Sequence, residues 1–88
     1  MKLAFKESFA KDLRRISDKD LLKQIRRILT SAATVCTLQE IAHLKKLRES
    51  GNCFRIRVGQ YRIGLVVEKD EIIFVRCLHR RDVYRYFP

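Results

Sequence analysis

Long apolar runs are absent from this sequence, and no stretch approaches the roughly 18 residues of a transmembrane helix. The opening segment, MKLAFKESFAKD, carries a charge every few positions and lacks the apolar core of a secretory signal. Repeats, low-complexity tracts and linkers are also missing. We therefore expect a single domain over residues 1–88, with no membrane partner.

Cysteine is scarce, and its three positions, Cys36, Cys53 and Cys77, are odd in number and widely spaced. They match neither a disulfide framework nor a CxxC metal site, which predicts reduced thiols and a cytoplasmic location. The sequence also lacks a carboxylate cluster for Mg²⁺, a Ser/His/Asp pattern and a P-loop. No metal and no other cofactor is therefore expected.

Acidic residues are outnumbered two to one, with 10 Asp and Glu against 20 Lys and Arg, so the net charge is +10. Such a charge predicts an anionic partner: nucleic acid, the ribosome or an acidic protein. A basic surface without a partner is the alternative. Residues 51–88 contain seven Arg and a single Lys, Lys69. Because arginine presents a planar fork of donors suited to phosphate, we expect specific phosphate contacts in this half.

Apolar residues recur at helical spacing in the first half of the chain. Residues 2–5 are predicted to form a short strand, and 7–16 an amphipathic helix. Ser17 or Asp18 can cap a second helix, which would make an αα-hairpin. Residues 37–48 are less regular and predict at most a short helical turn. The apolar positions are Phe9, Leu13 and Ile16, then Leu21, Leu22, Ile25, Ile28, Leu29 and Ala32, and then Leu38, Ile41 and Leu44.

The apolar period changes to two after a break at 50–52. The predicted fold is therefore α+β, with a short N-terminal strand and a helix hairpin packed on a twisted antiparallel sheet. A short segment would close the chain at the C-terminus. Strands are predicted at 53–58, 61–67 and 71–78, joined by two-residue turns at Gly59-Gln60 (type II′) and Lys69-Asp70.

The two tight turns predict how these strands pair. Arg57 would face Arg62 across the first turn, and Arg62 would in turn face Cys77. Because side chains alternate between faces, the helices would cover Phe54, Ile56, Val58, Tyr61, Ile63, Leu65, Val67, Ile72, Phe74 and Leu78, with Arg76 at a margin. The opposite face would hold Arg55, Arg57, Arg62 and His79 above Gly64, Val66, Ile73, Val75 and Cys77.

Like charges directly opposite on a sheet are destabilising, so the pairing of Arg57 with Arg62 indicates a functional site. Arginines that splay into solvent are the alternative. Arg80, Arg81 and Tyr84 follow His79 and can fold back over this face. Arginine, histidine and tyrosine together predict a phosphodiester site, where the arginines bind phosphate and His79 transfers a proton. RNA needs no metal-activated nucleophile there, because its 2′-OH supplies one.

The helix hairpin followed by KLRESGNCFRIRVGQYRIGLVVEKDEIIFVRCLHRRDVYR resembles the RelE/ParE toxin superfamily of type II toxin–antitoxin systems, in its RelE-like branch. The resemblance covers nearly the whole chain, and FRIRVGQYRI and HRRDVY are its most specific parts. It implies a microbial-RNase-like fold and a metal-independent endoribonuclease that cleaves mRNA in the ribosomal A site. The 2′-OH would attack, leaving a cyclic or 3′-phosphate and a 5′-OH.

The same resemblance implies roles by position. Arg57, Arg62, His79, Arg80 and Tyr84 would be catalytic, and Arg55 and Arg81 would bind substrate. The best-studied RelE-type enzymes have lysines at the positions of Arg55 and Arg57. Arginine cannot give up its proton in a protein, so we expect both to act electrostatically and His79, or otherwise Tyr84, to be the general base.

The resemblance also implies partners. These are an acidic, partly disordered antitoxin, the mRNA with the 16S rRNA of the 30S A site, and operator DNA bound through the antitoxin. The basic helix hairpin can contact ribosomal RNA or the antitoxin, or be an ordinary solvated face. A ParE-like inhibitor of DNA gyrase without nuclease activity is the alternative function. A nucleic-acid-binding module outside the toxin families is a further alternative, disfavoured because Phe54 and Tyr61 are predicted on the core side.

Overall fold

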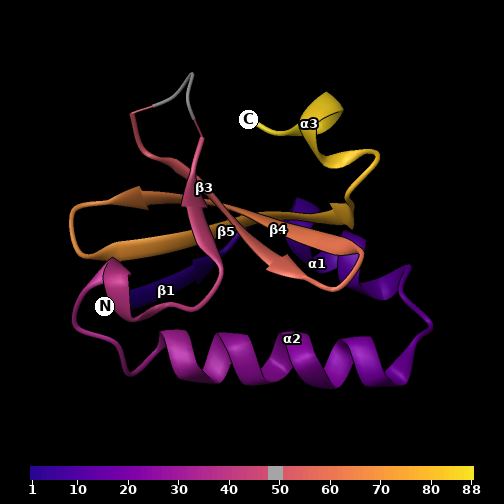
Figure 1. The fold of residues 1–88 in the computed structure, drawn as a ribbon, viewed down its shortest axis with the longest axis horizontal. Helices are drawn as coiled ribbons and strands as arrows, with labels where there is room; N and C mark the ends of the chain where they lie inside the picture. The colour runs from indigo at the N-terminus through magenta and orange to yellow at the C-terminus, as the bar shows by residue number, and fades with distance from the viewer. Residues whose placement is uncertain (48–50) are drawn as a thin grey trace.

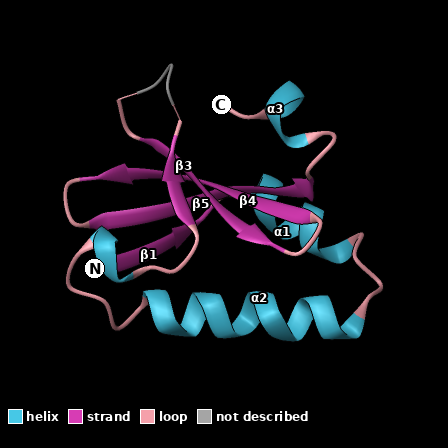
Figure 2. Cartoon of the chain, in the orientation of Figure 1, coloured by secondary structure: helices cyan, strands magenta, loops and turns pink. Residues whose placement is uncertain are grey.

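The fold was determined as a computed structural model, which describes residues 1–47 and 51–88 (Figure 1). The predicted break at 50–52 lies partly outside the described residues. Figure 2 shows helices on either side of one twisted sheet. The elements are β1 (Lys2–Phe5), α1 (Glu7–Arg14), α2 (Lys19–Ala32), a 3₁₀ turn η1 (Leu38–Glu40), β2 (Leu44–Lys46), β3 (Cys53–Val58), β4 (Tyr61–Glu68), β5 (Glu71–His79) and α3 (Val83–Tyr86).

The sheet has five strands in the order β1-β5-β4-β3-β2. β3, β4 and β5 form the predicted antiparallel meander, whereas β1 pairs with β5 in parallel. The α+β class is confirmed, but the sheet is mixed rather than purely antiparallel. The prediction of no more than a helical turn in 37–48 missed β2, a three-residue edge strand too short to display an alternating pattern.

Both predicted helices are present. Asp18 is the N-cap of α2, since its carboxylate accepts hydrogen bonds from the backbone N–H groups of Asp20 and Leu21 at 3.0 and 3.1 Å. The apolar sides of α1 and α2 join one face of the sheet in the main core, which includes Phe9, Leu21, Ile25, Ile56 and Phe74. None of the described helices is long and apolar enough to cross a bilayer.

A second, smaller core lies on the other face of the sheet. Val83 and Phe87, from the C-terminal segment, pack there against Cys53. The Phe87 ring lies directly over Gly64, and a Cβ at this position would come within 2.6 Å of the ring. Gly64 is therefore needed for close approach, and the C-terminal segment is a packed part of the fold. Figure 1 shows α3 on the opposite side of the sheet from α2.

The predicted register is correct between β3 and β4 and in the first half of β5. It is wrong in the second half of β5. Arg57 pairs with Arg62, and Glu68 with Glu71, as expected from two-residue loops. Gly59 has a φ of 57° and Lys69 a φ of 54°. Gly64, however, pairs with Arg76 and Leu65 with Phe74, so Val75 is an extra residue that bulges from β5.

This bulge reverses the predicted faces for the end of β5, because side-chain orientation alternates with each residue. Leu78 pairs with Arg62 and joins the small core, whereas Cys77 pairs with Ile63 and is buried in the main core. Their predicted positions were the reverse. His79 pairs with Tyr61, not Gln60. The prediction that His79 lies on the arginine face is therefore wrong.

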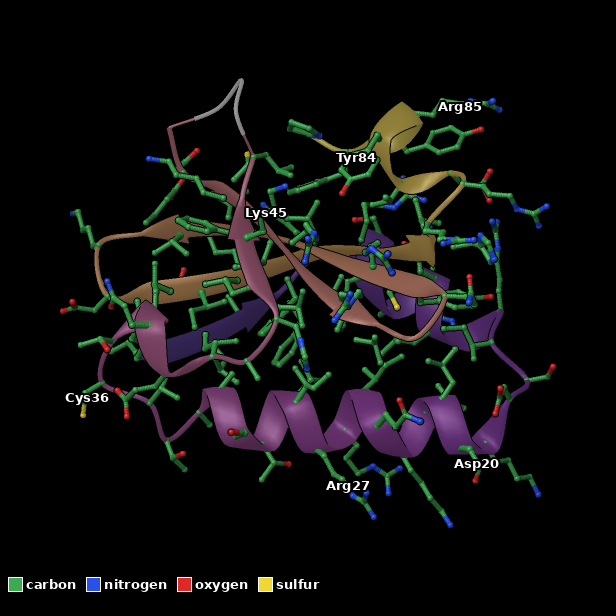
Figure 3. All side chains as sticks on the ribbon, viewed as in Figure 1. Asp20, Arg27, Cys36, Lys45, Tyr84 and Arg85 are labelled. Carbon is green, nitrogen blue, oxygen red and sulfur yellow. The ribbon has the colours of Figure 1, made fainter. Side chains whose placement is uncertain are left out.

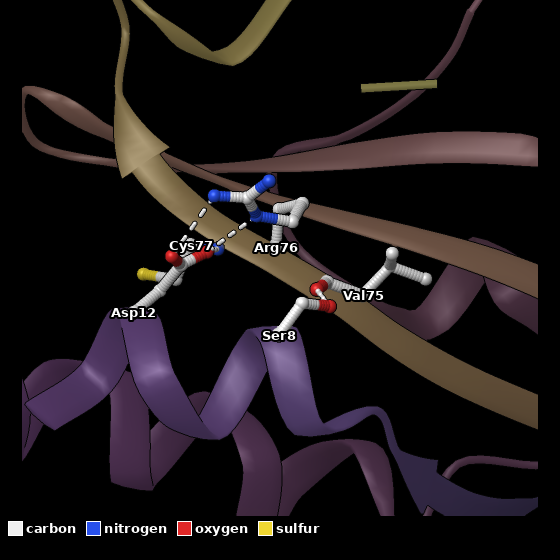
Figure 4. A network of polar contacts seen from close by, with 5 residues as sticks. All are labelled: Ser8, Asp12, Val75, Arg76 and Cys77. Carbon is white, nitrogen blue, oxygen red and sulfur yellow. Dashed lines mark hydrogen bonds and ion pairs between the residues drawn. The ribbon is translucent and has the colours of Figure 1, made fainter. Parts of the chain in front are cut away.

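Helix α1 replaces a strand beside the far half of β5, where β1 has ended (Figure 4). Ser8 Oγ donates to the carbonyl of Val75 at 2.6 Å, and the Asp12 carboxylate accepts from the backbone N–H of Cys77 at 2.9 Å. Asp12 also accepts from Nε and Nη2 of Arg76 at 2.8 and 3.1 Å. Arg76 thus lies at the sheet margin, and its contact with Asp12 raises the pKa of its guanidinium.

Candidate active site

Three of the predicted arginines line one cleft at the β3–β4 turn, where this end of the sheet meets α2. The cleft has a volume of about 550 Å³. Arg57 comes from the end of β3, Arg62 from the start of β4, and Arg80 from the residue after β5. The backbone N–H of Arg80 donates to Gln60 O at 2.8 Å, which ties the chain after β5 to the hairpin turn. The lining residues are Gln24, Ile28, His43, Arg57, Val58, Gly59, Gln60, Arg62 and Arg80.

Arg62 is held by the backbone of its own hairpin. Its Nη1 donates to the carbonyls of Gly59 and Tyr61 at 3.0 and 2.9 Å. Burial lowers the pKa of this guanidinium, and the charge of Arg55 acts in the same direction, with smaller effects from Arg57 and Arg80. Several positive charges therefore lie close together here, and the repulsion among them adds to the effect of burial. An anion in the cleft would relieve this repulsion.

Arg55 is held at the side of this cleft by a residue that the sequence analysis left out. Its Nη1 donates to the carbonyl of His43 at 2.8 Å, and the backbone N–H of Arg57 donates to the same carbonyl at 3.3 Å. The His43 ring lines the cleft with Nδ1 3.5 Å from Arg57 Nη2. Because Leu44 pairs with Ile56, recognising β2 in the sequence would have placed His43 opposite Arg57.

His79 and Arg81 do not line the cleft. The His79 ring packs edge-on against Tyr61, with ring centroids 5.7 Å apart. Its Nδ1 accepts from the backbone N–H of Arg81 at 3.1 Å and lies 3.4 Å from Arg81 Nε. In the neutral ring Nδ1 is then the acceptor and Nε2 carries the hydrogen. This tautomer leaves Nε2 able to donate a hydrogen bond but not to accept a proton.

Tyr84 projects from α3 and is exposed, at 58% of its full accessible surface. Its phenol acts on the guanidinium of Arg62 in the direction that raises the pKa of that group, opposite to the effect of burial. Figure 3 shows Tyr84 on the opposite side of the sheet from α2. An exposed aromatic ring beside an arginine can stack on a nucleobase while the cation binds the adjoining phosphate.

Metal ligands do not gather at this site. Within residues 1–47 and 51–88, the structure contains no group of three or more His, Cys, Asp and Glu side chains that could hold a metal ion. The residues that line the cleft carry no carboxylate. The planar guanidinium groups that line the cleft can bind a phosphodiester and stabilise additional negative charge on it.

Comparison with known proteins agrees with the fold. Residues 3–84 match the family of the ParE toxin of the type II toxin–antitoxin system parDE. The chain is 40% identical over 89 residues to Toxin RelE3 from Methanocaldococcus jannaschii, covering 100% of both chains.

Solved structures give the same result. The crystal structure of a RelB–RelE antitoxin–toxin complex from Methanococcus jannaschii matches with a TM-score of 0.83 and 39% identity, over 97% of this chain and 99% of that one. The RelBE2 toxin–antitoxin complex from Mycobacterium tuberculosis matches in fold alone, with a TM-score of 0.60 and 20% identity over 90% of this chain and 96% of that one. The chain therefore belongs to the RelE/ParE superfamily and is a RelE-family toxin of a type II toxin–antitoxin system.

Proposed function

We propose that this toxin is an endoribonuclease that cleaves mRNA in the A site of the ribosome, with the 2′-OH of the RNA as nucleophile and no metal ion. The observation that carries the proposal is the convergence of Arg57, Arg62 and Arg80 on one cleft without a carboxylate. A cleft of this kind suits the phosphorane that forms during 2′-OH attack, because that species carries more negative charge than the diester.

Each arginine has a separate task in this proposal. Arg57 and Arg80 bind the scissile phosphate. Arg62, which its hydrogen bonds to backbone carbonyls hold in one orientation, stabilises the negative charge that develops in the transition state. Tyr84 stacks on a base of the A-site codon. Arg55 and Arg81 bind neighbouring phosphates. His79 is left as a positioning residue for the turn that carries Arg80 and Arg81, since its Nδ1 is engaged there.

The proposed partners follow from charge and from the relatives. The M. jannaschii relative was solved as a complex with its antitoxin RelB. We propose an acidic, partly disordered antitoxin for this chain, which carries a net charge of +10 and would fold on the basic surface. Operator DNA would be bound through that antitoxin, and a ribosomal target implies a cytoplasmic location.

A gyrase inhibitor of the ParE kind is the second candidate, and one observation favours it: the matching family is described as ParE toxins. The two candidates differ in what the arginine cleft is for. An endoribonuclease depends on Arg57, Arg62 and Arg80, whereas inhibition of gyrase without cleavage places no demand on a phosphodiester site.

Primer extension in a reconstituted translation reaction tests the proposal. We expect new mRNA 5′ ends at A-site codons with ribosomes and none on naked mRNA. Arg62→Ala should lower the cleavage rate roughly 100- to 1000-fold, the usual effect of losing one transition-state donor. Lys69→Asn is the matched control, because it removes one exposed cation at the other end of β4 and asparagine tolerates the positive φ there. If the mRNA stays intact and DNA supercoiling is inhibited, the protein is a gyrase inhibitor and the proposal is wrong.

A further inference from the structure

His43 lies at the border of two hollows. One is the arginine cleft, and the other is a smaller hollow of about 170 Å³ between α2 and residues 41–43, lined largely by aliphatic groups such as Ile28, Ala32 and Ile41. His43 and Ile28 line both. A nucleotide whose phosphate occupies the arginine cleft could therefore place its sugar beside this imidazole and its base in the smaller hollow.

The backbone of His43 is held in an unusual conformation. Its φ is 62°, in the left-handed region that few residues other than glycine adopt. The carbonyl of His43 is fixed by Arg55 and by the backbone of Arg57. Non-glycine residues in this region occur preferentially at functional sites. The conformation directs an exposed imidazole toward Arg57 rather than into the core.

We propose that His43 is the general base of the cleavage reaction, an inference that rests on the proposed endoribonuclease function. Without substrate, Nδ1 faces Arg57 Nη2 at 3.5 Å, a long contact. An arginine N–H can only donate, so Nδ1 is the accepting nitrogen. When Arg57 turns its donors to a phosphate, Nδ1 is released as an acceptor next to that phosphate, where the attacking 2′-OH lies.

In this step His43 accepts the proton of the attacking hydroxyl. The proton of the 2′-OH passes to His43 Nδ1 as the 2′ oxygen bonds to phosphorus, and the bond from phosphorus to the 5′ oxygen breaks. Water supplies a proton to the departing 5′ oxygen, and the imidazolium later returns its proton to solvent. The products are a 2′,3′-cyclic phosphate and a 5′-OH. His79 is not placed for this role, because it does not line the cleft and its Nδ1 accepts from the backbone N–H of Arg81.

The charged groups that contact His43 or line the two hollows with it are all arginines. Arg55 and Arg57 come from β3, Arg62 from β4, Arg27 from α2 and Arg80 from the segment after β5. The residues that line these hollows include no acid. The imidazole is the one lining side chain that can accept a proton as a base, because the arginines beside it stay protonated. The cleavage rate should therefore depend on a single proton-accepting group.

Single-turnover cleavage on programmed ribosomes, measured between about pH 5.5 and 8.5, tests the inference. For the unaltered protein we expect the rate to rise with pH through one step and then level off, as it does for a base that must be deprotonated to act. His43→Asn keeps a side chain that tolerates positive φ. It should lose the step and lower the plateau by roughly 100- to 10,000-fold. Ribosome binding and thermal unfolding should stay unchanged, which separates a chemical role from a structural one.

Two controls sharpen the result. Lys69→Asn makes the same type of change at the other non-glycine residue with positive φ in the described chain, and it should leave rate and step unchanged. His79→Gln should retain the step. If the unaltered protein cleaves and His43→Asn keeps either the step or the full rate, the inference is wrong while the proposed function stands. If the unaltered protein does not cleave at all, the proposed function fails first.

Discussion

Cys77 occupies the main core because one extra residue, Val75, bulges from the strand before it. Its neighbour Leu78 consequently faces the C-terminal segment. Burial raises the pKa of the Cys77 thiol to about 12, and the nearby Asp12 carboxylate contributes in the same direction. Cys36, in contrast, is exposed. The three cysteines, which appear equivalent in the sequence, are therefore expected to differ in reactivity.

Thiol alkylation at about pH 8 should modify Cys36 first, and Cys53 and Cys77 only after unfolding, since both are buried. The raised pKa also affects stability. Between the ordinary value of 9.0 and about 12, the unfolded chain releases the Cys77 proton while the folded chain keeps it. The free energy of unfolding should thus fall as pH rises above about 9, following the difference in bound protons.

Denaturant unfolding across pH 7 to 11 measures this slope. Cys77→Ala removes the titrating group and should flatten the part of the slope that belongs to it, although its absolute stability will be lower because a buried side chain is truncated. Identical slopes in the two proteins, or alkylation of Cys77 as fast as Cys36 in the folded state, would contradict the placement of this residue.

At the scale of whole elements, helix α1 completes the hydrogen bonding of the sheet. β1 pairs only with the first half of β5, and Ser8 and Asp12 supply hydrogen-bonding groups to the remaining half. Asp12 is buried, yet its carboxylate has three donors from Arg76 and Cys77. The edge of β5 that β1 leaves open is thereby covered by α1.

Removing this carboxylate should be costly. Asp12→Ala leaves Arg76 without its ion pair and the Cys77 N–H without an acceptor, and we expect a loss of roughly 3–5 kcal/mol in the free energy of unfolding. Asp12→Asn retains an acceptor and should lose less. Glu7→Ala is the matched control on the same helix, because Glu7 makes only an exposed pair with Lys11 at 3.7 Å and should change stability by less than about 1 kcal/mol.

Equilibrium denaturation in urea gives all three values. If Asp12→Ala is as stable as Glu7→Ala, the junction between α1 and β5 does not depend on this network. A loss of stability confined to Asp12→Ala and Asp12→Asn would support that dependence.

The elements themselves were largely predictable, because each depends on local spacing: two amphipathic helices, three alternating strands and two tight turns. The bulge at Val75 was not, since a two-residue turn determines pairing only until an extra residue enters the strand. The parallel contact between β1 and β5 was missed for a similar reason. It joins Leu3 to Ile72, which lie far apart in the chain, and no local pattern indicates it.

At the scale of the whole molecule, charge and shape point to the same end of the sheet. The chain carries a net charge of +10, and three of its arginines line one cleft. Arg57 and Arg62 could be placed together from the sequence because a tight turn separates them. His79 was misplaced because of the bulge, and His43 was missed because its neighbour β2 is too short to recognise.

The measurement that most directly tests the central claim uses an mRNA with a single 2′-deoxynucleotide on the 5′ side of the bond that is cut in the A-site codon. The all-ribose mRNA on programmed ribosomes should be cleaved, and its downstream fragment should carry a 5′-OH. The account predicts that the deoxy-substituted mRNA stays intact at that bond, because its nucleophile is missing, while ribosome binding by the toxin is unchanged. Cleavage of the deoxy-substituted bond at a comparable rate would contradict attack by the 2′-OH and the role assigned to the arginine cleft.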